Sequence, residues 1–343
     1  MIEKSFHPNA QLKHTIAVIG AGVIGNSTAW HLAGLGHKVI LIDPQQSPRI
    51  NRKGQLNGTT ASLGVLMGNI FRRSSGRAWG LRQRSMKLWP LWIKELSTQN
   101  NPLQIDTPLV QLAASEEAFS SMEKLCKERQ HLGVELLSLD EIQKINRPWP
   151  QTTYGGLISQ KDGRIDPIKL QQCLYAALRT RNVQQITKKV INLKRSESST
   201  KSRWEIHLKD GIIPNQDIVV ICAGLGSAAL LKPLGHKRPI NRILGQVLDI
   251  QLEPDNKDWA KWPAVLISHG TNLICQEKDR LLVGATLEPG VKPDPNHLEQ
   301  MIKLEGDSPD WLKKAVISDH WHGIRCRPVD RPAPLLEKLE EGL

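Results

Sequence analysis

The sequence lacks the features of a membrane-spanning or secreted protein. No run reaches about 18 consecutive apolar residues, so no membrane-spanning helix is expected. The N-terminal stretch MIEKSFHPNAQLKH has no apolar segment of the kind found in secretory signals. The five cysteines are scattered and form no C-x-x-C motif, a pattern typical of reduced thiols. Together these absences predict a cytoplasmic protein.

The sequence also has no internal repeat, and few of its residues suggest hydrolytic or metal chemistry. No Ser-His-Asp set or pair of carboxylates stands out. His320 and His322 alternate along a strand-like run and share one face, but no third ligand at metal spacing accompanies them. No metal site is therefore predicted.

Positive charge exceeds negative charge. The chain has 46 Lys and Arg against 34 Asp and Glu, which gives a net charge of +12 over 343 residues. Such an excess is typical of proteins that bind nucleic acid, but it also fits a generally basic proteome or attraction to small anionic substrates. Because the charges are dispersed, we favour the second interpretation. The basic run from Phe71 to Ser85 is a candidate for RNA contact, although a solvated helix face is the favoured interpretation.

The stretch TIAVIGAGVIGNSTAWHLAGLGHKVILID, residues 15–43, predicts a complete β-α-β unit. Gly20, Gly22 and Gly25 have the G-x-G-x-x-G spacing of a dinucleotide-binding turn. The first permits a sharp turn, the second lets the backbone approach a pyrophosphate, and the third lets helix and strand pack closely. Asp43 ends the second strand, where a carboxylate accepts hydrogen bonds from ribose and disfavours the 2′-phosphate of NADP. The motif leaves NAD and FAD open.

Two adjoining segments are further candidates for cofactor contact. The helix begins at Val23 and Ile24, where free amides and the positive end of the helix dipole suit a phosphate. The segment NGTTASLGVLMGN, residues 57–69, is rich in hydroxyl groups and glycine and then turns apolar. Its hydroxyls suit a diphosphate or ribityl chain and its backbone a flat ring, with a flexible polar loop as the alternative. The residues predicted to make these contacts are Thr59, Thr60, Gly64, Val65 and Leu66.

The remaining pattern predicts an α/β protein of two domains. Residues 77–96 and 115–133 predict helices, and the second has Ser115 as a plausible N-cap and Gly133 just after its end. Residues 217–224, DIVVICAG, predict a second buried strand of the parallel type. Three later segments, RILGQVLDIQL, NLICQEKDRLLVGATL and HWHGIRCRP, predict further strands.

Seven stretches in order resemble the FAD-dependent D-amino-acid-oxidase superfamily, and within it the glycine oxidases. They are VIGAGVIG, GTTASLGVLMG, DGRIDPIKLQQCLYAAL, DIVVICAGLGS, ILGQVLDI, RLLVGATLEPG and WHGIRCRPVDRPAP. Singly they are weak, but as an ordered set they cover nearly the whole chain. The resemblance implies FAD as the cofactor, with Val190 on its adenine side and Ala223 and Gly224 closing over it.

The resemblance also implies a fold of two domains with different roles. It predicts a Rossmann-like FAD-binding domain with a parallel sheet, made of residues 1–95, 157–235 and 322–343. A second, α+β substrate domain dominated by an antiparallel sheet is predicted from residues 96–156 and 236–321. The family pattern continues beyond the end of this sequence into a glycine-rich segment that contacts the flavin ring.

The implied reaction is oxidation of a small amine or amino acid, such as glycine, sarcosine or a D-amino acid, to an imine. O2 or another acceptor takes the electrons, and reduction of O2 releases H2O2. Arg325 matches the arginine that binds the substrate carboxylate, a role its forked guanidinium suits. Leu273 appears at the position of a substrate-contacting tyrosine. Cys326 resembles the cysteine of relatives with a linked flavin, but a half-buried structural thiol is expected.

Two alternatives stay open. One is an oxidase that trims carboxymethylaminomethyl-uridine in tRNA, because GIRCRPVDRPAP resembles the R-C-x-x-x-D-x-x-P segment of that group. The other is a truncated, non-catalytic flavoprotein. Association of identical chains is a further possibility that the sequence does not test.

Overall fold

The computed structural model describes residues 13–47, 50–145, 149, 153–196, 203–252, 262–277 and 279–343. Packing divides the chain into two compact units. Unit 1 comprises Met1–Ser47, Leu174–Pro239 and Leu336–Leu343, and unit 2 comprises Pro48–Cys173 and Ile240–Leu335. The predicted domains differ chiefly in residues 48–95, 157–173 and 322–335, which cluster with unit 2 although they were assigned to the cofactor domain. The roles given to the two domains stay predictions.

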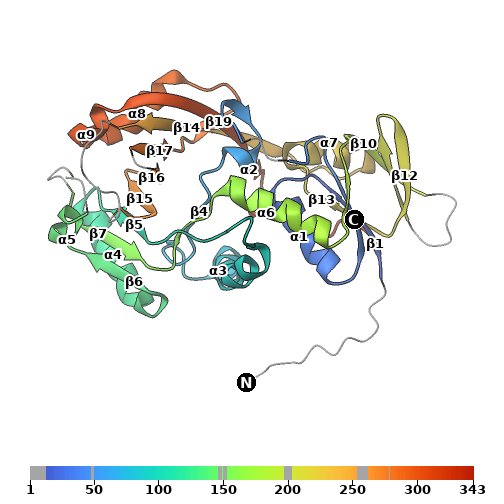
Figure 1. Ribbon diagram of the computed structural model, residues 1–343, viewed down its shortest axis with the longest axis horizontal. Coiled ribbons are helices and arrows are strands. Elements are labelled where there is room, and N and C mark those ends of the chain that lie inside the picture. The colour runs from blue at the N-terminus through green and yellow to red at the C-terminus, as the bar shows by residue number, and fades with distance from the viewer. Residues whose placement is uncertain are drawn as a thin grey trace. The chain divides into compact units, whose positions relative to one another are not determined.

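Unit 1 is built on a four-stranded parallel sheet in the order β13-β1-β2-β9. Helix α1 packs against β1 and β2. A three-stranded sheet, β10-β11-β12, shares a core cluster with the parallel sheet, in which Trp204 and Ile206 join Ile40 (Figure 1). Cover on both faces explains the continuous apolar runs of β1 and β2. The bounds are β1 Thr15–Ile19, α1 Val23–Gly34, β2 Lys38–Ile42, β9 Gln184–Ile186, β10 Val190–Arg195, β11 Trp204–Leu208, β12 Gly211–Gln216, β13 Ile218–Ile221 and α7 Ser227–Leu231.

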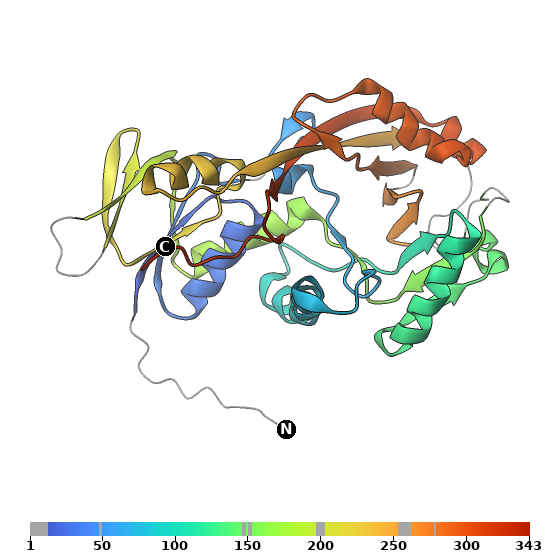
Figure 2. The same cartoon turned by 180° about the vertical axis from the view of Figure 1, so that it is seen from behind.

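The last residues of the chain belong to unit 1. The amide of Val219 on β13 donates to the carbonyl of Gly342 at 2.7 Å. Figure 2 shows this end of the chain beside the strands of unit 1. Because β13 is an edge strand, this contact covers part of an otherwise unpaired edge.

Unit 2 is built on a ten-stranded mixed sheet in the order β3-β19-β14-β17-β16-β15-β5-β7-β6, with β18 paired to β14. Most neighbouring strands are antiparallel, and the pairs β15–β5 and β19–β3 are parallel. The predicted α/β fold, with one parallel sheet and one mainly antiparallel sheet, is confirmed. The bounds are β3 Gly54–Leu56, α2 Gly58–Ala61, β4 Val65–Leu66, α3 Gly76–Leu96, β5 Leu109–Leu112, α4 Glu116–Arg129, β6 Val134–Leu137, α5 Leu139–Gln143, β7 Gly156–Ser159, β8 Gly163–Arg164, β14 Ile240–Gln251, β15 Val265–Ser268, β16 Thr271–Glu277, β17 Arg280–Gly284, β18 Glu288–Pro289, α8 Pro295–Lys303, α9 Asp310–Lys313 and β19 Val316–Pro328, while α6, Pro167–Thr180, runs from unit 2 into unit 1.

Both faces of this large sheet are buried, and alternate residues serve different cores. On β17, Leu282 joins a cluster with Met122 of α4. Its neighbours Leu281 and Val283 join a cluster with Leu312 of α9. This alternation follows from the two-residue repeat of a strand. We call the face that carries Leu282 the inner face, because α2 and β4 also lie on that side.

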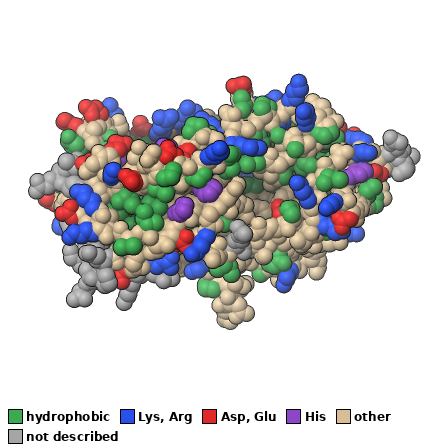
Figure 3. Space-filling model, turned by 90° about the horizontal axis from the view of Figure 1, so that it is seen from above, with side chains coloured by type: hydrophobic (Ala, Val, Ile, Leu, Met, Phe, Trp, Pro, Cys, Tyr) green, Lys and Arg blue, Asp and Glu red, His purple; other side chains and the backbone are tan. Residues whose placement is uncertain are grey.

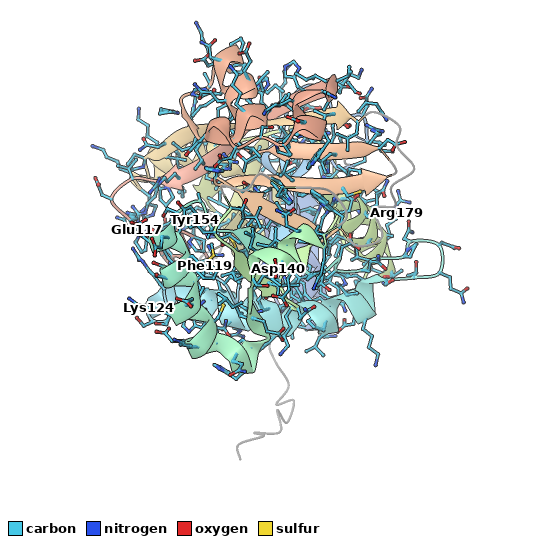
Figure 4. The ribbon with its side chains drawn as sticks, turned by 90° about the vertical axis from the view of Figure 1, so that its left-hand side faces the viewer. Glu117, Phe119, Lys124, Asp140, Tyr154 and Arg179 are labelled. Atoms are coloured by element: carbon cyan, nitrogen blue, oxygen red, sulfur yellow. The ribbon has the colours of Figure 1, made fainter. Side chains whose placement is uncertain are left out.

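The helix α4 confirms the caps that the sequence predicted. The hydroxyl of Ser115 accepts from the amide of Ala118 at 3.2 Å. A short 3-10 turn, Gln130–Leu132, extends the helix, and Gly133 ends this turn with a φ of +78°. Figure 4 shows Glu117 and Lys124 on its outer side and Phe119 on its inner side. Such a helix is held by its apolar face rather than by its exposed charges.

The distribution of surface charge and the state of the cysteines agree with what the amino-acid composition predicts. In Figure 3, lysine and arginine side chains are interspersed with acidic ones across the face in view. All five cysteines are free. Among the described helices, none is long and apolar enough to cross a membrane.

A buried carboxylate fixes the segment that follows β4. Asp162, between β7 and β8, is 0% exposed. It accepts from the backbone amides of Gly68 at 2.9 Å, Asn69 at 3.0 Å and Ile70 at 2.9 Å. A buried charge is tolerated where several donors satisfy it. This anchor sets the position of β4 and of the glycine-rich stretch before it.

We predict that Asp162→Ala lowers the free energy of unfolding by roughly 3 kcal/mol or more, because it leaves three buried amides without an acceptor. Urea unfolding followed by tryptophan fluorescence measures the change. Asp210→Ala is the control, since Asp210 forms an exposed ion pair with Lys188 at 3.0 Å and its loss costs about 1 kcal/mol or less. Equal effects of the two substitutions would contradict the anchoring role.

Candidate functional site

The turn between β1 and α1 leaves no room for side chains at two of its glycines. Gly20 has a φ of +106°, and a Cβ there would lie 2.4 Å from the carbonyl oxygen of Cys222. A Cβ on Gly25 would lie 1.7 Å from the carbonyl oxygen of Gly20. The first turn of α1 therefore packs directly on the backbone of the loop, as the motif requires.

Asp43 ties the end of β2 to this turn. Its Oδ2 accepts from the amide of Ala21 at 2.8 Å, and its Oδ1 accepts from the amide of Gln45 at 2.6 Å. The carboxylate thus holds the glycine loop in place. Each oxygen keeps a second lone pair, so the predicted contact with a ribose stays compatible with this position.

The start of α1 suits an anion. Gly22 is the N-cap, no side chain caps the helix, and its first turn contains no acidic residue. Below it the buried Asn26 donates to the carbonyl of Ala21 at 3.0 Å. An uncapped, acid-free helix start presents its dipole and amides to a phosphate. The residues of unit 1 therefore fit the diphosphate of a dinucleotide.

Ala223 and Gly224 lie next to this turn. They follow β13, which pairs in parallel with β1. A Cβ at Gly20 would lie 2.9 Å from the amide nitrogen of Ala223. Both segments therefore leave the carboxyl ends of adjacent parallel strands, where ligands of open α/β sheets bind. Val190 begins β10 and is buried in the core of unit 1, so its predicted backbone contact with adenine stays a prediction.

The threonine segment of unit 2 forms the short helix α2. Asn57 caps it, with its Oδ1 accepting from the amide of Thr60 at 2.9 Å. Thr60 is 0% exposed, and its hydroxyl accepts from Gln171 at 3.4 Å. The structure therefore gives Thr60 an internal position. Thr59 is only partly buried, and it is the threonine that remains accessible.

The predicted ring-facing segment forms β4 rather than a free loop. Val65 and Leu66 pair with Arg164 and Gly163 of β8. Gly64, with a φ of +74°, approaches Ile165 so closely that a Cβ would lie 1.9 Å from its carbonyl oxygen. Pairing with β8 thus fixes the backbone that the sequence predicts to lie along a flat ring.

Helix α2 packs on the strand that carries Arg325. A Cβ at Gly323 would lie 2.3 Å from the Cβ of Ala61, and the indole nitrogen of Trp321 donates to the carbonyl of Ala61 at 3.0 Å. Trp321, Gly323 and Arg325 lie on the same face of β19 because they alternate along it. Within unit 2, the fold therefore brings the threonine segment and Arg325 together.

Arg325 is held on one edge and free on the other. Its Nη1 donates to the carbonyls of Thr286 at 2.8 Å and Leu244 at 3.4 Å. The guanidinium lies over Gly245, where a Cβ would be 2.5 Å from Nη1. The residue is still exposed to solvent, although partial desolvation of the guanidinium lowers the pKa of Arg325. Among the described residues, no carboxylate forms an ion pair with it and no acceptor engages its Nε–Nη2 edge.

Leu273 does not occupy the substrate position that the resemblance gives it. It is 0% exposed and packs in the core cluster that contains α9, on the other face of the sheet from the inner face. Its neighbour Asn272 takes the inner side, in register with Gly284 on the row that leads to Trp321. A shift of one residue along a strand reverses the face, which explains the error.

The structure also places a cysteine, a histidine pair and a glycine that bear on the site. Cys326 is exposed, which corrects the expectation of a half-buried thiol. Among the described residues, no group of His, Cys, Asp and Glu side chains could hold a metal, His320 and His322 included. Gly245 was missed. A glycine inside the apolar run RILGQVLDI was the available signal, because glycine within a strand often marks a close approach.

Comparison with known proteins gives one family. A family model described as FAD dependent oxidoreductase (DAO) matches residues 15–343. A glycine oxidase of Bacillus licheniformis is 23% identical over 323 residues, which cover 93% of this chain and 82% of the relative. A glycine oxidase of Pseudomonas putida is 24% identical over 318 residues, 90% of this chain and 82% of the relative. The crystal structure of glycine oxidase from Geobacillus kaustophilus superposes with a TM-score of 0.79 at 19% identity, covering 96% of this chain and 87% of that one.

We predict that Gly25→Ala abolishes retention of FAD and lowers the melting temperature, because the methyl group would collide with the carbonyl of Gly20. Flavin absorbance after gel filtration, together with thermal unfolding, measures both effects. Gly80→Ala is the matched control, since a Cβ there meets nothing within 4 Å. The control should keep its flavin. If Gly25→Ala also keeps its flavin, the turn is not the dinucleotide site.

Proposed function

Because the chain belongs to the FAD-dependent oxidoreductase family, we propose that it oxidises the C–N bond of a small amino acid or amine. The substrates we propose are glycine, sarcosine or a D-amino acid, with O2 as the acceptor that is reduced to H2O2. FAD is the cofactor of the family. The family supplies the cofactor and the reaction class, and Arg325 supports a substrate that carries a carboxylate.

The free edge of Arg325 is the observation that carries this proposal. The Nη1 side is occupied by two backbone carbonyls, which fixes the plane of the guanidinium. Its Nε–Nη2 edge is the geometry that bonds both oxygens of one carboxylate. A cation that is partly desolvated and has no described counter-ion is better stabilised when an anion binds. An amino-acid substrate brings such an anion.

We assign the remaining roles to named groups of the chain. When bound, FAD supplies the two-electron chemistry by accepting a hydride from the substrate carbon. The turn at Gly20 and Gly25 and the start of α1 would hold its diphosphate, and β4 would lie beside its ring. Arg325 would hold the carboxylate and so keep the α-carbon in place, a contribution of orientation rather than proton transfer. The amine must arrive unprotonated for the hydride to leave.

Purification of the chain tests the proposal directly. We expect a yellow protein that releases FAD on denaturation. Peroxide should form with an amine panel that includes glycine, sarcosine and D-alanine. A flavin-loaded protein that produces no peroxide and shows no flavin reduction with any member of the panel would overturn the substrate class.

We predict that Arg325→Lys lowers kcat/KM for the preferred carboxylate substrate roughly 10²-fold, about 2.7 kcal/mol, because a lysine cannot reproduce the bidentate pair. The matched control is Arg327→Lys, a second exposed arginine of the same strand whose side chain makes no hydrogen bond to any described residue. Steady-state kinetics with peroxide readout measure both variants. Flavin content should not change, and an amine that lacks a carboxylate should lose far less. Equal kcat/KM for Arg325→Lys and the parent would refute the clamp.

A second function, action on a modified uridine of tRNA, is favoured by one observation. Helix α3 exposes cations spaced along a single side: Arg77, Arg84, Lys87 and Lys94. Such a stripe suits phosphates, and binding through it would weaken steeply with salt. A gel shift with tRNA at several salt concentrations separates the two functions, because the amino-acid oxidase needs no such binding.

A further inference from the structure

Two arginines of unit 2 are withdrawn from water without a matching set of acceptors. Arg164 on β8 is 4% exposed. Arg52 stacks its guanidinium on the ring of Trp321, 5.2 Å from the ring centre, and it makes no hydrogen bond to any described residue. The Nε atoms of both arginines are buried and lack a partner in the part of the chain that the structure describes. Burial of this kind is costly unless the cation is paired.

The acidic groups nearby are already engaged. Asp166 lies 4.0 Å from Arg164, and its other oxygen accepts from the amide of Ile168 at 2.8 Å at the start of α6. Asp249 pairs with Arg280. Asp106, which pairs with Arg164 through its backbone, accepts from the side chain of Gln104 at 2.8 Å. Each nearby carboxylate therefore already has another partner.

The surroundings lower the pKa of both arginines. For Arg52 burial is the largest cause. Asp166 and Asp249 oppose it, and the charge of Arg164 adds to it. For Arg164 burial again dominates, and the charges of Asp166 and Asp106 oppose it. The amide of Gln276 lies against Arg164 and, with its oxygen turned inward, accepts from both Nη1 and Nη2, the latter at 3.2 Å. The Nε atom of each arginine still has no partner among the described residues.

These cations lie on the same side of the sheet as Arg325. Trp321, on whose ring Arg52 stacks, is on the inner face of β19 together with Gly323 and Arg325. The guanidinium of Arg325 lies over Gly245, and Gly245 pairs directly with Gly323. Trp321 is two residues from Gly323, which is about 7 Å along a strand. The guanidinium groups of Arg325 and Arg52 therefore lie along the inner face at a separation that one small molecule can span.

We propose that Arg52 and Arg164 bind a second acidic group of the substrate, so that the preferred substrate is an amino acid with two carboxylates. This inference rests on the proposed function, because Arg325 holds the carboxylate next to the oxidised carbon. Arginine suits both ends, since its planar fork bonds both oxygens of a carboxylate. A substrate with one carboxylate would leave Arg52 and Arg164 unpaired.

We predict that the full-length, FAD-loaded protein binds malonate or succinate at least tenfold more tightly than acetate at equal ionic strength. Isothermal titration calorimetry, with the shift in melting temperature as a second readout, measures these affinities without turnover. In Arg52→Gln the preference for the dicarboxylate should fall about tenfold, while the affinity for acetate stays unchanged. Arg164→Lys, which keeps the charge, should fold and should weaken dicarboxylate binding less.

Arg179→Gln is the matched control. Arg179 also stacks on a ring, with its guanidinium carbon 4.8 Å from the centre of Tyr175, but it is exposed on α6 (Figure 4). This variant should keep the dicarboxylate preference of the parent. Equal affinity for acetate and succinate in the parent, or full preference in Arg52→Gln, would overturn the inference.

The same titrations separate other origins of the result. If Arg52→Gln weakens binding of FAD but leaves the dicarboxylate preference intact, the anion is a cofactor phosphate and the inference is wrong. Dicarboxylate binding that depends on Arg52, in a protein that oxidises no amine, would support the anion site and reject only the proposed function. In an active enzyme, kcat/KM for iminodiacetate or D-aspartate should exceed that for glycine, and the reverse order would count against the inference.

Discussion

Close approach of backbone to backbone is the constraint on which the candidate site depends. A Cβ would lie 1.7 Å from a carbonyl oxygen at Gly25, 1.9 Å at Gly64 and 2.4 Å at Gly20, and 2.3 Å from the Cβ of Ala61 at Gly323. Each contact joins a segment that carries predicted site residues to its neighbour in the fold. Two of them position the start of α1, one sets β4 on β8, and one sets α2 on β19. Any side chain at these positions would separate the segments, so glycine is required by geometry rather than by flexibility.

The sequence predicted these features unevenly, for physical reasons. The turn at Gly20 was predictable because its glycines lie within one local motif whose spacing reflects one turn and one helix start. Gly323 and Gly245 make contacts with segments far away in the chain, and no local pattern marks such partners. The parallel sheet was predictable from continuous apolar runs. The ten-stranded order of the second sheet was not, because β14 and β19 are distant in sequence and only the structure fixes their register.

Errors in the site followed from the two-residue repeat of strands. The resemblance placed Leu273 at the substrate, yet an offset of one residue moves a side chain from the inner face to the opposite core. Burial settles the matter, since Leu273 is 0% exposed and packs with α9. The same parity argument puts Arg325 on the inner face, because Gly323 and Trp321, two and four residues before it, both contact α2. Alternation along a strand is thus a sharper guide to a site than alignment over a short motif.

Unit 2 stores uncompensated positive charge on a single face, and this has consequences for stability as well as binding. Asp162 shows how the fold satisfies a buried charge, since three backbone amides point at it. Arg52, Arg164 and Arg325 lack an equivalent set of acceptors among the described residues. Burial lowers the pKa of each of the three arginines. Because Arg325 is exposed whereas Arg164 is 4% exposed and Arg52 partly buried, the cost of keeping the charge falls mainly on Arg164 and Arg52. A ligand that carries carboxylates would remove that cost on binding, so affinity for the anion and stability of the fold are linked through the same three side chains.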